Sequence, residues 1–198
     1  MSFFRCLPGA DALSAFRQQR LLSLLATQGI ELSSITAQYL HFVWSEQELS
    51  ANQVSTLEAL LQYGEPFATT KATQSVIVIP RFGTVSPWAS KATDIARQCG
   101  LEVLRIERGV RYQWTSKKNL NPSQEQILET ALFDRMTEVI VTAENDVHAL
   151  YQTLPDRPFT RIDVMGQGKA ALEHANQSLG LALSADEIGY LEENFKRL

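Results

Sequence analysis

Hydrophobic positions along residues 1–133 follow two spacings that alternate along the chain. Short apolar and aromatic runs predict β-strands, at residues 2–7, 35–44, 75–79 and 102–114. Stretches with apolar side chains three or four positions apart predict helices after each run, at residues 11–28, 50–64, 87–99 and from 121 onward. The order strand–helix–strand–helix therefore occurs twice, although the two halves share little residue identity.

Local start signals support two of these helices. Ser50 with Gln53 has the spacing of a capping box, in which the two residues satisfy each other's free backbone N–H groups. Asn121 caps the last of these helices, with Pro122 in the first turn and Gln124 at the third helical position. Glycines that follow the first two helices are typical stop signals. The helix positions therefore rest on end signals as well as on apolar periodicity.

Two strand–helix–strand–helix units predict an α+β fold, in which an antiparallel sheet carries its helices on one face. Gly109 lies within the run 102–114 and suggests that this strand is bent. Apolar and polar residues alternate imperfectly at 35–44 and at 102–114. This pattern suggests that polypeptide outside this segment covers one face of the sheet.

The pattern changes near residue 145. We predict three parts: an α+β domain at 1–145, a connector at 146–160 and the beginning of a helical domain at 161–198. The stretch around the connector contains Pro155 and Pro158, several charges and no clear period. A short strand at 161–165, a helix at about 168–178 and a last helix follow, and Ser184 and Glu187 form the capping box of the last helix. Because residues 161–198 are too few to form a convincing hydrophobic core alone, we expect them to pack on a neighbour.

Composition narrows the class of protein. The 198 residues are 44% hydrophobic and 20% charged, which is ordinary for a globular protein. A formal net charge of −4 and the lack of a basic block argue against a nucleic-acid surface. No signal peptide is evident, and no run approaches the ~20 apolar residues of a membrane span. Cys6 and Cys99 are the only cysteines, and we expect two reduced thiols in a cytoplasmic protein.

The stretch PRFGTVSPWASKATD, which follows the third predicted strand, is the strongest candidate for a site. Ser86 and Pro87 begin a helix, and the free N–H groups of a helix start attract anions. Arg81 and Lys91 would assist the binding of a phosphate or carboxylate there. The alternative is a capped corner in which Trp88 packs beneath the helix, Arg81 pairs with a carboxylate and Lys91 lies in solvent. Pro87 removes one donor and favours the alternative.

Other motifs carry weaker signals. Residues 166–171, GQGKAA, formally fit the dinucleotide fingerprint, but no buried strand follows to complete the unit, so we interpret them as a glycine turn. His41, His148 and His174 lack neighbouring ligands at metal spacing, and we expect no metal site. The sequence has no evident nucleophile or phosphate-loop motif. The charged run 134–138 is either a solvated helix end or an interdomain latch.

Seven stretches in a fixed order resemble the N-terminal region of the large, single-chain phosphoribosylformylglycinamidine synthase family, also called FGAR amidotransferase. They are PRFGTVSPWASKATDIARQCGL, RIERGVRY, ALSAFRQQRLL, YLHFV, LLQYG, DRMTE and GQGKAALEHANQSLGLALSADEIGYLEENF. The resemblance covers essentially the whole chain.

This resemblance implies that residues 1 to about 145 form a domain similar to a dimer of the small companion subunit of multi-subunit versions. Residues from about 160 would begin a mostly helical linker domain. The parent enzyme would make formylglycinamidine ribonucleotide for purine biosynthesis. Its synthetase domain would bind ATP and magnesium, and its glutaminase domain would release ammonia from glutamine. Both domains would be partners of this segment within one chain.

The asparagine-serine-glutamate-histidine motif that follows the linker in the family is absent from these residues. We therefore expect a segment of a longer enzyme that catalyses nothing alone and binds no cofactor itself. If isolated, the segment is expected to self-associate through uncovered apolar faces.

The resemblance also suggests a role for the candidate corner. We expect it to face the synthetase domain near the substrate entrance, through Arg81, Thr84, Ser86, Trp88, Ser90 and Lys91. Two other classes of function stay open. One is a free-standing regulatory or adaptor domain for a small ligand, because doubled strand–helix units also occur in such modules. The other, an independent enzyme, is disfavoured because no catalytic motif is evident.

Overall fold

The computed structural model describes residues 2–68, 71–116, 118–152 and 159–197. The chain divides into two compact units, Met1–Leu154 and Pro155–Leu198. Each unit has its own hydrophobic cluster or clusters, and each is described by itself.

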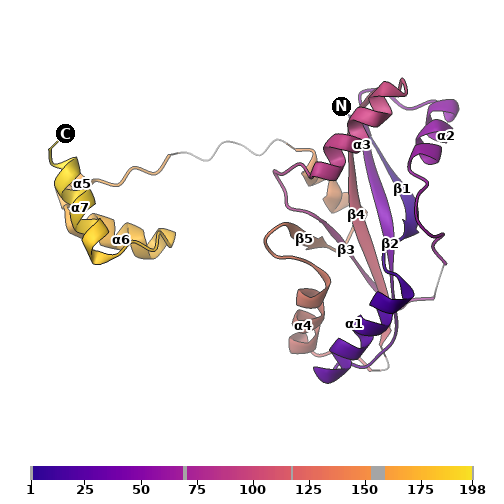
Figure 1. Cartoon of the computed structure of the whole chain (residues 1–198), viewed down its shortest axis with the longest axis horizontal. Coiled ribbons are helices and arrows are strands. Elements are labelled where there is room, and N and C mark those ends of the chain that lie inside the picture. The colour runs from indigo at the N-terminus through magenta and orange to yellow at the C-terminus, as the bar shows by residue number, and fades with distance from the viewer. Residues whose placement is uncertain (1, 69–70, 117, 153–158, 198) are drawn as a thin grey trace. The chain divides into compact units, whose positions relative to one another are not determined.

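The described residues of the first unit form a five-stranded antiparallel sheet with the strand order β1-β2-β4-β3-β5 (Figure 1). The strands are β1 (Phe3–Asp11), β2 (Leu32–Ser45), β3 (Gln74–Pro80), β4 (Val103–Ser116) and β5 (Glu138–Val141). The two long strands β2 and β4 pair at the centre, from Leu32 opposite Ser116 to Ser45 opposite Val103. The short strand β5 extends the sheet beyond β3 and was not predicted from the sequence.

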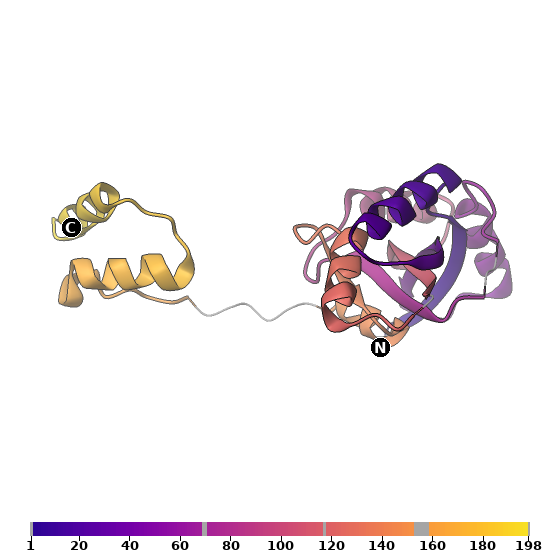
Figure 2. The same ribbon diagram turned by 90° about the horizontal axis from the view of Figure 1, so that it is seen from below.

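The α-helices of this unit lie on one face of the sheet (Figure 2). They are α1 (Ala15–Thr27), α2 (Ala51–Leu60), α3 (Pro87–Gln98) and α4 (Pro122–Leu132). Helices α1 and α4 pack around Ile35 of β2, whereas α2 and α3 pack around Val43 of the same strand. These two residues are an even number of positions apart, so their side chains point to the same face. The α+β class with helices on one face is therefore confirmed.

The opposite face carries a 3-10 helix, η1 (Glu144–Leu150). Its Val147 and Leu150 are buried against Phe42 and Trp44, which alternate with the residues of the helical face. Residues 146–150, which lie in the predicted connector 146–160, contribute Val147 and Leu150 to this second core layer. The polypeptide that covers part of the other sheet face is thus a nearby segment of the same chain.

The doubled pattern is visible in the helix starts as well as in the order of elements. Ser14 caps α1 and Ser86 caps α3, each through its side-chain oxygen. Ser50 begins α2 with the predicted capping box, and Asn121 caps α4 as predicted and also forms a capping box with Gln124. Because the central strands are antiparallel, the two halves meet about an approximate twofold axis between β2 and β4.

Gly109 allows the neighbouring strands to lie close to β4. The pairing of β4 with β2 runs through this residue without a register shift, so the predicted bend is not accompanied by a bulge. A Cβ atom at Gly109 would lie 2.8 Å from the carbonyl oxygen of Val78 and 2.8 Å from the ring of Phe42. Any side chain at this position would therefore collide with both neighbouring strands.

The second unit contains α5 (Val164–Gln167), α6 (Lys169–Leu179) and α7 (Ala185–Phe195). The strand predicted at 161–165 is wrong. Asp163 accepts a hydrogen bond from the backbone N–H of Gly166 and caps α5 instead. The capping box of Ser184 and Glu187 is confirmed. A small cluster of Val164, Leu172 and Ile188 holds the helices together.

Two further observations concern the cysteines and the helices of the described residues. Cys6 is half-buried and Cys99 is exposed, and both are free thiols. None of the described helices has the length and apolar character that a membrane crossing requires.

Candidate functional site

The loop of residues 81–86 leads from β3 across the edge of β4 to the start of α3. Pairing between β3 and β4 ends at Val78 opposite Val110, so the edge of β4 beyond this point is open for the loop. The loop ends at Ser86, whose Oγ accepts a hydrogen bond from the backbone N–H of Ala89 at 3.0 Å. This geometry confirms the predicted helix start.

The start of α3 is occupied by the carboxylate of Glu107, a side chain that is fully buried. Its Oε1 accepts a 2.6 Å hydrogen bond from the hydroxyl of Ser86, and its Oε2 accepts a 3.3 Å bond from the backbone N–H of Ser86. The backbone N–H of Arg108 donates to Oε1 at 3.0 Å. A carboxylate of the chain itself therefore lies beside the cap of α3, where an external phosphate or carboxylate was one of two alternatives.

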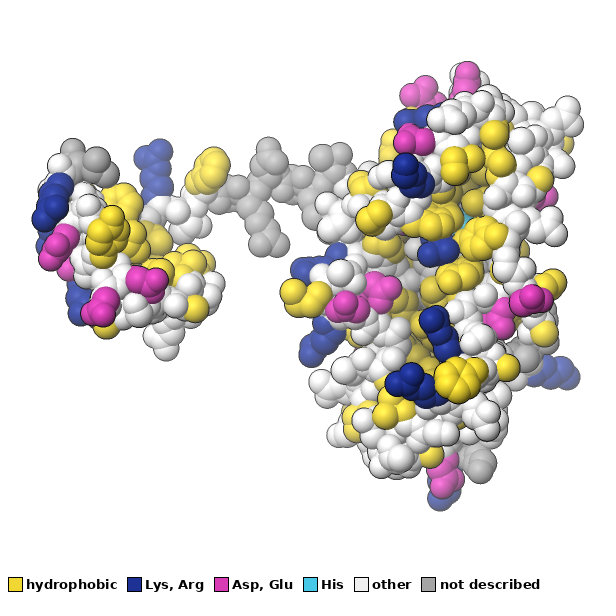
Figure 3. All heavy atoms as spheres, viewed as in Figure 1, with side chains coloured by type: hydrophobic (Ala, Val, Ile, Leu, Met, Phe, Trp, Pro, Cys, Tyr) yellow, Lys and Arg dark blue, Asp and Glu magenta, His cyan; other side chains and the backbone are white. Residues whose placement is uncertain are grey.

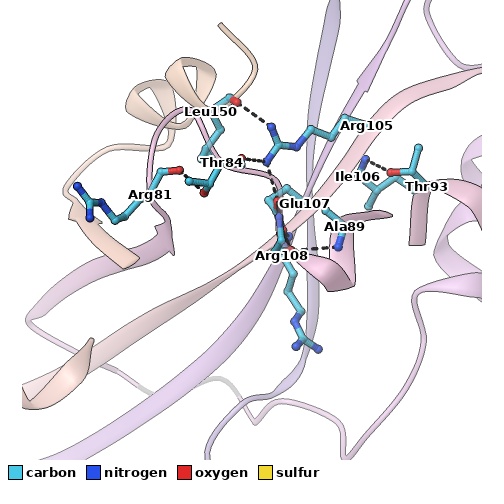
Figure 4. Close-up of polar contacts among 10 residues, drawn as sticks. Arg81, Thr84, Ala89, Thr93, Arg105, Ile106, Glu107, Arg108 and Leu150 are labelled. Atoms are coloured by element: carbon cyan, nitrogen blue, oxygen red, sulfur yellow. Dashed lines mark hydrogen bonds and ion pairs between the residues drawn. The ribbon is translucent and has the colours of Figure 1, made fainter. Parts of the chain in front are cut away.

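Arg105 neutralises this carboxylate and ties three segments together (Figure 4). Its Nη2 lies 2.7 Å from Oε2 of Glu107 and also donates to the carbonyl oxygen of Thr84 at 2.8 Å. Its Nη1 donates to the carbonyl oxygen of Leu150, at the end of η1, at 2.9 Å. Strand β4, the loop before α3 and the 3-10 helix are thus joined through one guanidinium group.

A cavity of about 620 Å³ lies beside this pair, between α3, the loop and the end of η1. Its walls include Ser90, Asp94 and Arg97 of α3 together with Val85, which is 60% exposed. The guanidinium group of Arg97 donates to the carbonyl oxygens of Val103 and Leu104. The surface is concave, with an exposed apolar residue and a polar rim, which suits contact with another polypeptide.

The structure places the six predicted site residues on two sides of α3. Thr84 and Ser90 line the cavity, Arg81 is exposed at the start of the loop, and Ser86 is the cap. Trp88 and Lys91 instead line an apolar groove of about 180 Å³ that α3 shares with α2. The six residues therefore do not form one continuous surface.

The predicted partner of Arg81 is also different. Its Nη1 donates to the carbonyl oxygen of Met136 at 3.3 Å and pairs with no carboxylate among the described residues. The charged residues that build the corner are Arg105 and Glu107, which sequence reasoning missed. The motif RIERG did hold a signal, because two opposite charges two positions apart on a strand share one face. Across the described ranges, no group of side chains has the composition of a metal site.

A protein-family model supplies an independent comparison. The model described as formylglycinamide ribonucleotide amidotransferase N-terminal matches residues 38–151. This match covers more than half of the chain, from within β2 to the end of η1, and it includes the whole corner.

Proposed function

Because the chain belongs to the formylglycinamide ribonucleotide amidotransferase N-terminal family, we propose that it is the docking segment of this glutamine-dependent ligase of purine biosynthesis. In this proposal the segment acts by binding other domains of the enzyme, and it supplies no catalytic group. ATP and magnesium bind elsewhere in the parent enzyme, and the partners are its synthetase and glutaminase domains. The enzyme works in the cytoplasm.

The observation that carries the docking role is the construction of the corner around the start of α3. An ion pair holds an exposed loop in a fixed position; its Glu107 side chain is fully buried and its Arg105 side chain is 12% exposed. The exposed side of the same loop presents Val85 and Thr84 beside a cavity of about 620 Å³. A rigid scaffold under an exposed, partly apolar rim is a typical design for a protein interface.

The proposal assigns the contact to one side of α3. Thr84, Val85 and Ser90 face the synthetase domain near the entrance for the nucleotide substrate. Trp88 and Lys91 belong to a different surface and contribute to this contact only through the position of the helix. This division refines the earlier expectation that all six residues act together.

Two charge-introducing variants in the full-length enzyme test the docking role. Val85→Asp places a charge on the proposed contact, and Phe16→Asp places one on α1, where Phe16 is 74% exposed. We expect Val85→Asp to lower glutamine-dependent turnover at least tenfold and Phe16→Asp to leave it within twofold. The isolated segment with Val85→Asp should also fail to compete for binding to an enzyme that lacks it. Unchanged turnover and unchanged binding in Val85→Asp would disprove the docking surface.

A further inference from the structure

Arg108 points away from the corner, toward the helical face of the sheet (Figure 4). There its guanidinium carbon lies over three aromatic rings. The distance to the ring centre is 4.4 Å for Tyr39, 4.8 Å for Trp88 and 5.9 Å for Tyr63. These residues come from β2, from α3 and from the segment after α2, so the fold brings distant parts of the chain together around one cation.

The guanidinium group of Arg108 has few polar partners. Its Nη1 donates to the hydroxyl of Tyr63 at 3.2 Å, and no ion pair involves it among the described residues. Arg105, on the same strand, binds two carbonyl oxygens and a carboxylate through Nη1 and Nη2, while its buried Nε has no partner among the described residues. Arg108 is half-buried, and a partly desolvated cation without a counter-ion is costly. The remaining donors of Arg108 are therefore available to an anion.

His41 extends this cluster into the sheet. The ring is fully buried, stacks on Trp88 with centroids 5.7 Å apart, and its Nε2 lies 2.8 Å from the hydroxyl of Tyr63. Nδ1 is buried and has no hydrogen-bond partner among the described residues. Burial and, secondly, the charge of Arg108 lower the pKa of His41 to about 4. His41 is thus neutral near pH 7, and the cluster carries the single positive charge of Arg108.

Space for a ligand lies beside the cluster. A cavity of about 540 Å³ between β1 and α2 has Gly9, Glu58 and Phe67 in its walls, and the cluster borders it through Tyr63. Tyr63 also borders the groove that contains Trp88 and Lys91. Figure 3 shows basic and hydrophobic side chains gathered along the hollow of this face. A cavity of this size with an apolar wall and a few directed polar groups is typical of a small-molecule site.

We propose that the Arg108 cluster, formed by Tyr39, His41, Tyr63, Trp88 and Arg108, binds the phosphate or carboxylate group of a small organic anion. The planar guanidinium offers parallel N–H donors that match an oxyanion, and the rings hold its plane in place. The hydroxyl of Tyr63 fixes one of its nitrogens. The rest of the ligand lies against the apolar wall on the Tyr63 side. This site is separate from the docking corner, and the inference does not depend on the docking role.

Binding is tested on the full 198-residue chain with inorganic phosphate, acetate and ribose 5-phosphate as probes, against sodium chloride at equal ionic strength. The readouts are the NMR signals of arginine side chains and tryptophan fluorescence, to which Trp44 and Trp114 contribute as well as Trp88. We expect a saturable change with phosphate or acetate and tighter binding of ribose 5-phosphate than of inorganic phosphate if the natural ligand is a phosphate. Tighter binding of acetate than of phosphate would assign a carboxylate ligand.

Arg108→Gln should weaken binding at least tenfold. Arg111→Gln is the matched control, because Arg111 lies on the same strand, points to the opposite face and pairs with Glu144. That variant should bind within twofold of the parent chain. If Arg108→Gln does not fold, Arg108→Lys and Tyr63→Phe supply the test, and each should weaken binding severalfold. No saturable change, or equal binding by the Arg108 and Arg111 variants, would overturn the proposal.

Discussion

Arg105 and Glu107 form a buried ion pair although they are only two positions apart on one strand. The distance from Nη2 to Oε2 is 2.7 Å, and the side chains are 12% and 0% exposed. Residues at this spacing point to the same face of a sheet, here beyond the end of β3. The pair can therefore reach the loop before α3 and the end of η1 at the same time. One local charge pattern thus fixes the tertiary position of three segments.

Replacing Glu107 by Gln should destabilise the first unit strongly. The change leaves Arg105 as a buried cation without its counter-ion, and breaking a buried pair from one side costs about 3–5 kcal/mol. The free energy of unfolding, measured by urea titration with circular dichroism, checks this value.

Glu144→Gln is the matched control for the Glu107 variant. Glu144 pairs with Arg111 at the surface, where its side chain is 46% exposed. An exposed pair contributes about 0–1 kcal/mol, because water and salt screen both charges. Equal losses of stability in the two variants would show that the buried pair does not hold the corner.

The cap of α3 should contribute more to the free energy of unfolding than the cap of α2. Both Ser86 and Ser50 accept a hydrogen bond from a backbone N–H of the first turn. Ser86 also donates to the buried carboxylate of Glu107, whereas Ser50 is exposed. Loss of an ordinary cap costs about 1 kcal/mol, and a buried hydrogen bond to a charged group adds about 1.5–3 kcal/mol.

Urea unfolding of Ser86→Ala and Ser50→Ala measures this difference. We expect the Ser86 variant to lose at least twice as much stability as the Ser50 variant. The result would contradict this view of the corner if the two losses agreed within about 0.5 kcal/mol, the usual spread of surface substitutions.

Features fixed by neighbours in sequence were predictable. The capping boxes at Ser50, Asn121 and Ser184 depend on residues three positions apart, and the structure contains all three. Strands and helices that bury a continuous apolar stripe were found for the same reason. The doubled order of elements then indicated the sheet and the side on which its helices pack.

Features fixed by distant neighbours were not predictable. The role of Glu107 depends on Ser86, which lies far away in sequence, and the role of Gly109 depends on Phe42 and Val78. Strand β5 is short, and it pairs with β3, which pairs with β4 along its other edge. The prediction of a strand at 161–165 relied on apolar residues there, but Asp163 accepts a hydrogen bond from the backbone N–H of Gly166 and begins a helix instead. The domain limits and the contact residues of the corner stay predictions.

The ring of His41 should leave no room for a side chain at Gly9. A Cβ atom at Gly9 would lie 2.5 Å from Cε1 of His41 and 3.1 Å from Cβ of Tyr39. Overpacking of this kind costs about 1–3 kcal/mol. The cost of Gly9→Ala should therefore fall to below about 1 kcal/mol in a His41→Ala background, because the closest contact is then absent.

Unfolding free energies of the two single variants and the double variant measure this coupling. Gly29→Ala is a useful comparison, because Gly29 has a φ of +78° and no atom within 4 Å of its added Cβ. Its cost arises from the backbone and should be the same with or without His41. A Gly9→Ala cost that does not depend on His41 would rule out the close contact as its cause.

Stability should depend on pH through His41. Its pKa is lowered to about 4 in the folded chain, from an ordinary value of 6.5, first by burial and then by Arg108. The unfolded state thus binds the proton more readily, so stability is fully present above pH 6.5 and is lost as pH falls toward 4. A shift of this size corresponds to a loss of about 3 kcal/mol at the acid end of that range.

Urea unfolding of the parent chain and of His41→Gln at pH 7, 6, 5 and 4 isolates the contribution of His41 to stability, since carboxylates titrate alike in both. The parent should lose more stability than the variant between pH 6.5 and 4. Parallel pH profiles would show that the folded chain holds His41 with an ordinary pKa.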